Sequence, residues 1–229
     1  MANDVTKIVE GVIQSRRSVR AFRKDPVSQE VLTRIMEVAS SAASAGNMQP
    51  WRVYVLTGDG LKRVVNAVCQ AYETEPGQHT SEYEYLPKNN FDPYLSRRRK
   101  LGLAMYSLLG IEKGDKARMH AQHRRNFEFF DAPVGLIFTM DRKLPTACFF
   151  DLGAFWQNIM IAAKSHGLDT CMQTIWSDYH RVIARELKFS EDEMMLGGMS
   201  LGYADTAAVI NTLVPERAPV STFATFVRD

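Results

Sequence analysis

The sequence predicts an α+β fold in which a central sheet is flanked by helices. Segments whose apolar residues recur at helical spacing alternate with short runs of β-branched and aromatic residues, which indicates helices packed on strands. One run, residues 134–140, is apolar almost throughout, as expected of a strand covered on both faces. At 229 residues, 45% of them hydrophobic, the chain can bury a substantial core.

The first part of the chain is expected to form helices around one strand. Asp4 precedes the first apolar helical run and is expected to cap that helix. Ser28 has the position of an N-cap for the second helix. The elements predicted here are helices over residues 5–13 and 31–42, a buried strand over residues 52–57 and a helix that follows Asp59.

A polar stretch without periodicity follows at residues 72–90, and stretches of this length inside a domain are usually functional lids or disordered. Two helices come next, over residues 92–110 and from Asp115 onward. We expect residues 72–130 to form a helical lid over a pocket. Three phenylalanines near its end either pack in the core or contact a substrate: Phe127, Phe129 and Phe130.

The remaining part of the chain predicts strands, two helices and an extended tail. Residues 149–166 are apolar on most sides, so this helix is expected in the domain centre or in a dimer interface. Asp178 is expected to cap a helix that ends at Leu187, and Ser190 and Glu193 have capping-box spacing. Further strands are predicted over residues 171–175 and 194–201, and residues 208–227 have no helical period and are expected to pack on a partner.

Composition excludes several classes of function. The formal net charge of +2 is too small to indicate nucleic-acid binding, although residues 97–100 form a basic cluster. We find no leader and no apolar run that could span a bilayer, and we expect a cytoplasmic protein without membrane association. Cys69, Cys148 and Cys171 form no CxxC motif and are expected to be buried free thiols.

Two polar motifs together suggest a phosphorylated, planar cofactor. Residues 16–20 read Arg-Arg-Ser-Val-Arg at the end of the first helix, where they could simply complement the helix dipole. Residues 44–51 read Ser-Ala-Gly-Asn-Met-Gln-Pro-Trp and supply directional donors and acceptors. Arginine forks suit phosphate, and such a loop suits a heterocycle. The alternative to a cofactor site is that Ser18 and Arg20 form an ordinary helix terminus and that Trp51 packs in the core.

The order of the motifs resembles the FMN-dependent nitroreductase family. The two motifs are followed by Gly-Tyr-Ala-Asp at residues 202–205 and by Arg-x-Pro at Arg217. The resemblance covers essentially the whole chain, and residues 97–141 are most similar to bacterial nitrobenzoate reductases. It implies a nitroreductase-like α+β fold in a domain-interlocked homodimer. That fold has a central mixed sheet in one domain over residues 1–229, a lid insertion at about 72–130 and a C-terminal arm at about 208–229.

The resemblance also implies which residues contact FMN. The phosphate and ribityl chain would be held by Arg16, Ser18, Arg20 and Arg217, and Arg17 would meet the pyrimidine edge. Ser44 and Asn47 would cross the isoalloxazine, largely from the other subunit. Better-known members have a Glu-Gly pair where this chain has Trp176-Ser177, so the resemblance does not assign the hydrogen bond to flavin N5. The full set of expected contacts is Arg16, Arg17, Ser18, Arg20, Ser44, Ala45, Asn47, Gln49, Gln173, Ile175, Trp176 and Arg217.

The activity that the resemblance implies is reduction of nitroaromatic compounds by NADH or NADPH in a ping-pong cycle of hydride transfer. We therefore expect no catalytic acid or base side chain. A candidate substrate is 4-nitrobenzoate, whose carboxylate would pair with a lid cation. The sequence does not select among the available lid cations, which are Arg97, Arg98, Arg99, Lys100, Arg124 and Arg125.

Other functions stay open at this point. Reductive dehalogenation of the iodotyrosine deiodinase type is one alternative, and the branch that makes a cobalamin ligand from FMN is another. The lid supplies the residue types of a deiodinase clamp, without its spacing, in Glu82, Tyr83, Tyr85 and Lys88. A flavin-free interaction protein with a basic lid is a third alternative. His120 and His123 lie one helical turn apart, but nothing completes a metal site, so no metal is expected.

Overall fold

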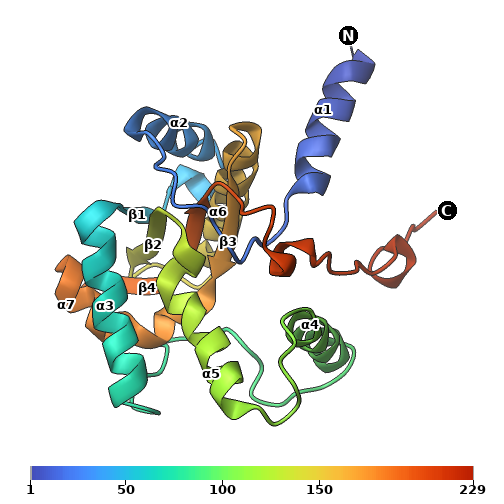
Figure 1. The fold of residues 1–229 in the computed structure, drawn as a ribbon. Coiled ribbons are helices and arrows are strands. Elements are labelled where there is room, and N and C mark those ends of the chain that lie inside the picture. The colour runs from blue at the N-terminus through green and yellow to red at the C-terminus, as the bar shows by residue number, and fades with distance from the viewer. Residues whose placement is uncertain (1, 229) are drawn as a thin grey trace.

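The core of the protein is a four-stranded sheet with helices on both faces (Figure 1). The computed structural model describes residues 2–228, with side chains from Asp4 onward. The strands are β1 Arg52–Leu56, β2 Val134–Asp141, β3 Asp169–Gln173 and β4 Glu193–Gly202, in the order β1-β2-β4-β3. Each pairing is antiparallel, so the expectation of a mixed sheet is wrong. In the described chain, parallel pairing occurs as an isolated bridge between Ser18 and Thr170.

The two central strands are buried because both of their faces carry apolar side chains. In β2, Ile137 packs into one cluster, whereas Leu136 and Phe138 pack into the other, as the two-residue period of a strand requires. The expectation of a buried strand at residues 52–57 is wrong for most of its length. β1 lies at the sheet edge, and Arg52 and Val55 are exposed.

Amphipathic helices cover the two faces of the sheet. One face carries α2 Gln29–Ala39 and α6 Cys148–Ser165, and the other carries α3 Gly58–Thr74 and α7 His180–Leu187. Ile35 of α2 and Ile159 of α6 are fully buried in one cluster, and Val64 of α3 and Ile183 of α7 are fully buried in the other. The most hydrophobic helix of the sequence, α6, thus buries one side against the sheet, whereas Phe150 on it is 82% exposed. A place for this helix in a dimer interface stays a prediction.

The capping predictions have mixed outcomes. Ser28 caps α2, because its hydroxyl accepts a hydrogen bond from the Val31 amide at 3.3 Å. Asp4 lies inside the first turn of α1 Ala2–Ser15 and not before it. Asp178 does not cap α7, whose N-cap is Tyr179; its carboxylate instead accepts hydrogen bonds from the lid. The Ser190 and Glu193 pair forms a capping-box bond of 3.3 Å, but a strand follows it.

The lid contains α4 Tyr94–Leu108, α5 Lys116–Arg124 and a 3-10 turn, Arg125–Asp131 (Figure 1). Phe127, Phe129 and Phe130 of this turn are at most 1% exposed, so they pack in the core. Gly135 makes this packing possible, because a Cβ at that position would lie 2.5 Å from the Phe129 ring. That the lid begins and ends at residues 72–130 stays a prediction.

Both ends of the chain project from the body (Figure 1). Val5, Ile8 and Val9 of α1 are at least half exposed, although they form the apolar face of that helix. Phe223 and Phe226 of the extended tail are each more than 70% exposed. Among the described residues, no helix is long and apolar enough to cross a membrane.

Candidate functional site

The Arg-Arg-Ser-Val-Arg segment runs as an extended chain along the outer edge of β3. The Val19 amide donates to the Thr170 carbonyl at 3.1 Å, and the Phe22 amide donates to the Phe130 carbonyl at 3.1 Å. Val19 and Phe22 are buried, 1% and 5% exposed. Because successive side chains of an extended segment point to opposite sides, the buried Val19 leaves Ser18 and Arg20 on the other side.

Asn211 anchors this segment from the far end of the sequence. Its side-chain oxygen accepts from the Arg20 amide at 2.8 Å, and its side-chain nitrogen donates to the carbonyls of Ala21 and Asp205, both at 2.8 Å. The side chain is 4% exposed. The Gly-Tyr-Ala-Asp motif contributes as well, since the Asp205 amide donates to the Ala21 carbonyl at 3.0 Å. Sequence reasoning missed Asn211, because no local pattern marks it.

Positive charge in this segment is not neutralised by acidic groups. Arg16, Arg17 and Arg20 are each partly buried, and within residues 2–228 none of them forms a salt bridge to a carboxylate. Among the described residues, the Arg20 guanidinium donates a hydrogen bond to the Ser18 carbonyl alone, at 3.3 Å. Burial raises the pKa of the Cys171 thiol, while the nearby Arg20 and Arg16 act in the opposite direction. Partly desolvated cations of this kind favour an anionic ligand.

A cavity of about 290 Å³ opens beside Arg20, between this segment and the lid. The lid contributes Arg98 and Tyr106 from α4, Gln122 from α5 and Asn126 from the following turn. The cavity lining thus combines two guanidiniums, two amides and aromatic surface. Its lining residues include no carboxylate.

Gln173 supports the cavity wall from behind. It is 4% exposed; its amide nitrogen donates to the Asn126 carbonyl at 2.7 Å, and its oxygen accepts from the Ser200 hydroxyl at 2.7 Å. Because both ends of the amide are engaged inside the protein, the Gln173 side chain fixes the turn that carries Asn126.

Trp176 lies in the core with its side chain fully buried. Its ring stacks on Phe129 at a centroid distance of 4.1 Å and covers Gly198, where a Cβ would lie 2.8 Å from the indole. The indole therefore packs within the protein, and Ile175 beside it is partly buried. A role for Trp176 in cofactor binding stays a prediction, and in this structure only its backbone atoms could make the contact.

The loop over residues 44–49 forms a tight turn after α2. The Ser44 hydroxyl accepts from the Gln49 amide at 3.1 Å, and the Ala45 amide donates to the buried carboxylate of Asp151 at 3.3 Å. Asn47 and Gln49 have φ angles of 57° and 48°, a strained region for side chains other than glycine. In the described chain no hydrogen bond or ion pair links this loop to residues 16–20.

Arg217 lies on the exposed tail. Its guanidinium donates to the carbonyls of Pro215 and Glu216 at 3.1 and 3.2 Å, and the Glu216 side chain pairs with Lys100 of α4 at 2.6 Å. Among the described residues no contact brings Arg217 to Arg16 or Arg20. Within the described residues, one chain therefore brings Arg20 to the cavity and Gln173 to the turn that carries Asn126 of its lining, but neither Arg217 nor the loop.

Comparison with known proteins identifies the family. A family model described as "Nitroreductase family" matches residues 13–203. The chain belongs to the nitroreductase family. It is 41% identical over 221 residues to a nitrobenzene nitroreductase from Ectopseudomonas oleovorans, covering 96% of this chain and 97% of that protein. It is 36% identical to a 4-nitrobenzoate reductase from Pseudomonas putida, covering 97% of each chain.

Solved nitroreductase structures confirm the fold. The crystal structure of the FMN-dependent nitroreductase NfnB from Mycobacterium smegmatis, in complex with NADPH, superposes with a TM-score of 0.93. That protein is 30% identical, and the alignment covers 98% of this chain and 100% of that one. The family and its α+β fold, both predicted from the motifs, are thus confirmed.

Side chains that could have served a deiodinase-type clamp are engaged elsewhere. Glu82 pairs with Arg142 at 2.6 Å, the Tyr85 hydroxyl donates to Asp178 at 2.7 Å, and the Tyr83 hydroxyl donates to the Leu196 carbonyl. These contacts fasten the lid segment to the body of this nitroreductase, so no observation favours the dehalogenase alternative.

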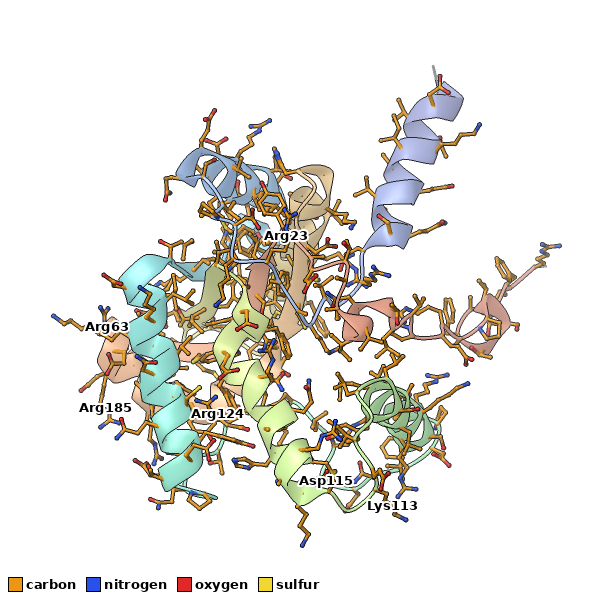
Figure 2. The ribbon with its side chains drawn as sticks, viewed as in Figure 1. Arg23, Arg63, Lys113, Asp115, Arg124 and Arg185 are labelled. Atoms are coloured by element: carbon orange, nitrogen blue, oxygen red, sulfur yellow. The ribbon has the colours of Figure 1, made fainter. Side chains whose placement is uncertain are left out.

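His120 and His123 of the lid pack around a tyrosine. The Tyr72 hydroxyl lies 3.2 Å from a ring nitrogen of His120 and 3.1 Å from one of His123. Arg124, labelled in Figure 2, lies between α5 and α3 and pairs with Glu73 at 3.1 Å. In the part of the chain that the structure describes, no group of His, Cys, Asp and Glu is arranged to hold a metal ion.

Proposed function

We propose that this protein is an FMN-dependent nitroreductase that oxidises NADH or NADPH and reduces nitroaromatic compounds. The observation that carries the proposal is the set of partly buried arginines at residues 16–20, which have no acidic partner among the described residues. One of them, Arg20, borders the cavity. The names of the relatives agree with it, since they are nitrobenzene, 4-nitrobenzoate and FMN-dependent nitroreductases. When bound, the flavin supplies the hydride-transfer chemistry.

The donor set of the site fits such a cofactor. Arg16, Ser18 and Arg20 would hold the phosphate and ribityl chain, because guanidinium forks and a hydroxyl match phosphate oxygens. Arg17 would face the pyrimidine edge. Hydrogen bonds to Thr170 and Asn211 fix the backbone of this segment, so its donors are oriented before any ligand arrives.

The protein's own task in the reaction is to bind and orient. None of the side chains that line the cavity is a carboxylate, and burial, with a smaller contribution from His120, lowers the pKa of His123, the histidine in the lining. A neutral imidazole is favoured there at neutral pH. We therefore assign no residue of this chain as a dedicated catalytic acid or base.

The working unit that we propose is a homodimer. The apolar face of α1 and the phenylalanines of the tail are exposed in one chain, and exposed apolar patches of this kind typically mark interfaces. A second subunit would also bring Ser44, Asn47 and Arg217 to the cofactor, since contacts within one chain do not. Sedimentation or light scattering should accordingly report twice the mass of one chain.

The decisive experiment is anaerobic stopped-flow on the purified protein. The preparation should be yellow, its flavin absorbance should bleach with NADPH or NADH, and nitrobenzene should restore it. A colourless protein that binds no added FMN would contradict the proposal and favour the alternative of a flavin-free interaction protein. Reduction without reoxidation by any nitroaromatic would contradict the substrate class alone.

A further inference from the structure

The lid cations differ sharply in what they contact. Arg124 pairs with Glu73 and Glu128, Arg125 pairs with Asp131 at 2.8 Å, and Lys100 pairs with Glu216 at 2.6 Å. Acidic side chains of the protein itself thus neutralise these three. The other three candidate cations all lie on α4 and are Arg97, Arg98 and Arg99. None of these three has a salt bridge within the described residues.

Of the six lid cations considered as partners of a substrate carboxylate, Arg98 alone lines the cavity beside Arg20. Within the part of the chain that the structure describes, its guanidinium donates one hydrogen bond, to the side-chain oxygen of Asn90 at 2.9 Å. Asn90 is neutral, so it can orient the guanidinium without neutralising it. A guanidinium has five N–H donors, and four of those on Arg98 remain available to a ligand.

The cavity has the size and lining of a site for a small aromatic acid. Its volume of about 290 Å³ is slightly below the usual range of ligand pockets, so it can hold a single ring but is small for a dinucleotide. Tyr106 offers aromatic surface, and Gln122 offers an amide. No acidic side chain lies in the lining to repel an anion.

We propose that Arg98 is the residue that selects a carboxylate on the nitroaromatic substrate, through a bidentate pair with its guanidinium. The inference rests on the proposed function and adds a substrate class to it, the nitrobenzoates. Arg20 is assigned to the cofactor, whereas Arg98 lies on the lid across the cavity. A guanidinium at this position binds a planar carboxylate through two parallel hydrogen bonds.

The test compares charged and neutral ligands on the holoprotein. Binding of benzoate and of its neutral isostere benzamide to the oxidised protein is measured by calorimetry, together with kcat/KM for 4-nitrobenzoate and nitrobenzene. Arg98→Gln should weaken benzoate binding, and lower kcat/KM for 4-nitrobenzoate, by about ten- to a hundredfold. Benzamide and nitrobenzene should change by less than about twofold. Arg98→Lys should be intermediate, because it keeps the charge and loses the fork.

Arg97→Gln is the matched control, since Arg97 precedes Arg98 on α4 and does not line the cavity. Equal losses for charged and neutral ligands, an equal loss in Arg97→Gln, or no loss in Arg98→Gln would overturn the inference. Loss of FMN or a raised KM for NADPH in Arg98→Gln would assign the anion to a cofactor phosphate, which also overturns it. A wild-type protein that reduces nitrobenzene but does not bind benzoate refutes the inference alone, whereas a protein without flavin refutes the proposed function.

Discussion

Replacement of Asn211 tests whether the cofactor segment is held by the C-terminal part of the chain. Asn211→Ala removes three hydrogen bonds of 2.8 Å from a side chain that is 4% exposed. At about 1 kcal/mol for each bond, we expect the free energy of unfolding to fall by about 3 kcal/mol. In a protein of this size that corresponds to a melting temperature lower by about 6–12 °C.

The same substitution should weaken FMN retention, because the Arg20 amide loses its anchor. Asn211→Asp should be at least as destabilising, since it turns two donors into acceptors that face the carbonyls of Ala21 and Asp205. The measurements are urea unfolding at a fixed FMN concentration and flavin content after gel filtration. Added FMN should raise the melting temperature of the wild type, because it binds the folded state.

Asn158→Ala is the matched control for this experiment. Asn158 is partly buried and donates a single long bond, 3.4 Å, to the Ala39 carbonyl, so its loss should cost less than about 1 kcal/mol. If Asn211→Ala unfolded within about 1 kcal/mol of the wild type and kept equimolar FMN, the anchoring role would be refuted.

Three further perturbations probe the cofactor site, the core and the acid response. Arg20→Ala should lose bound FMN, measured by absorbance, while circular dichroism shows an unchanged fold, because its guanidinium has no acidic partner in the described chain. Gly135→Ala should lower the free energy of unfolding by about 1–3 kcal/mol, since the new Cβ would lie 2.5 Å from the Phe129 ring. Burial lowers the pKa of His180, against an opposing effect of Glu82, so the unfolded chain binds more protons on acidification. That contribution to the free energy of unfolding is present above about pH 6.5 and is lost as the pH falls through the pKa of His180 in the folded protein. In His180→Gln, the free energy of unfolding measured with urea should therefore fall less steeply as the pH is lowered.

Each of these has an outcome that contradicts it. Stoichiometric FMN in Arg20→Ala would remove that residue from the phosphate site. For the core, Gly153→Ala on α6 is the control, because a Cβ there meets nothing within 4 Å; equal stability of the Gly135 and Gly153 variants would disprove the close packing at Phe129. An unchanged acid slope in His180→Gln would mean that other groups dominate the acid response.

Local patterns predicted most of the secondary structure. The helical periods of α2, α3 and α6 were readable because each helix buries one face, or most faces, against the sheet. Ser28 was identifiable as a cap because a cap bonds to the amide three residues ahead. The expected cap at Asp178 is wrong because Ser81 and Tyr85, about a hundred residues earlier, take that carboxylate.

The sequence by itself determined the family, through the order of motifs, and the type of chemistry, through arginines and a polar loop. Only the tertiary structure decided which of these residues share a site. Arg98 could not be separated from its neighbours by sequence, because whether a cation stays unpaired depends on acidic groups brought near by folding. Asn211 was invisible for the same reason, since its partner Arg20 lies 191 residues away. Charge and periodicity are properties of neighbouring residues, whereas burial and pairing are properties of the packed chain.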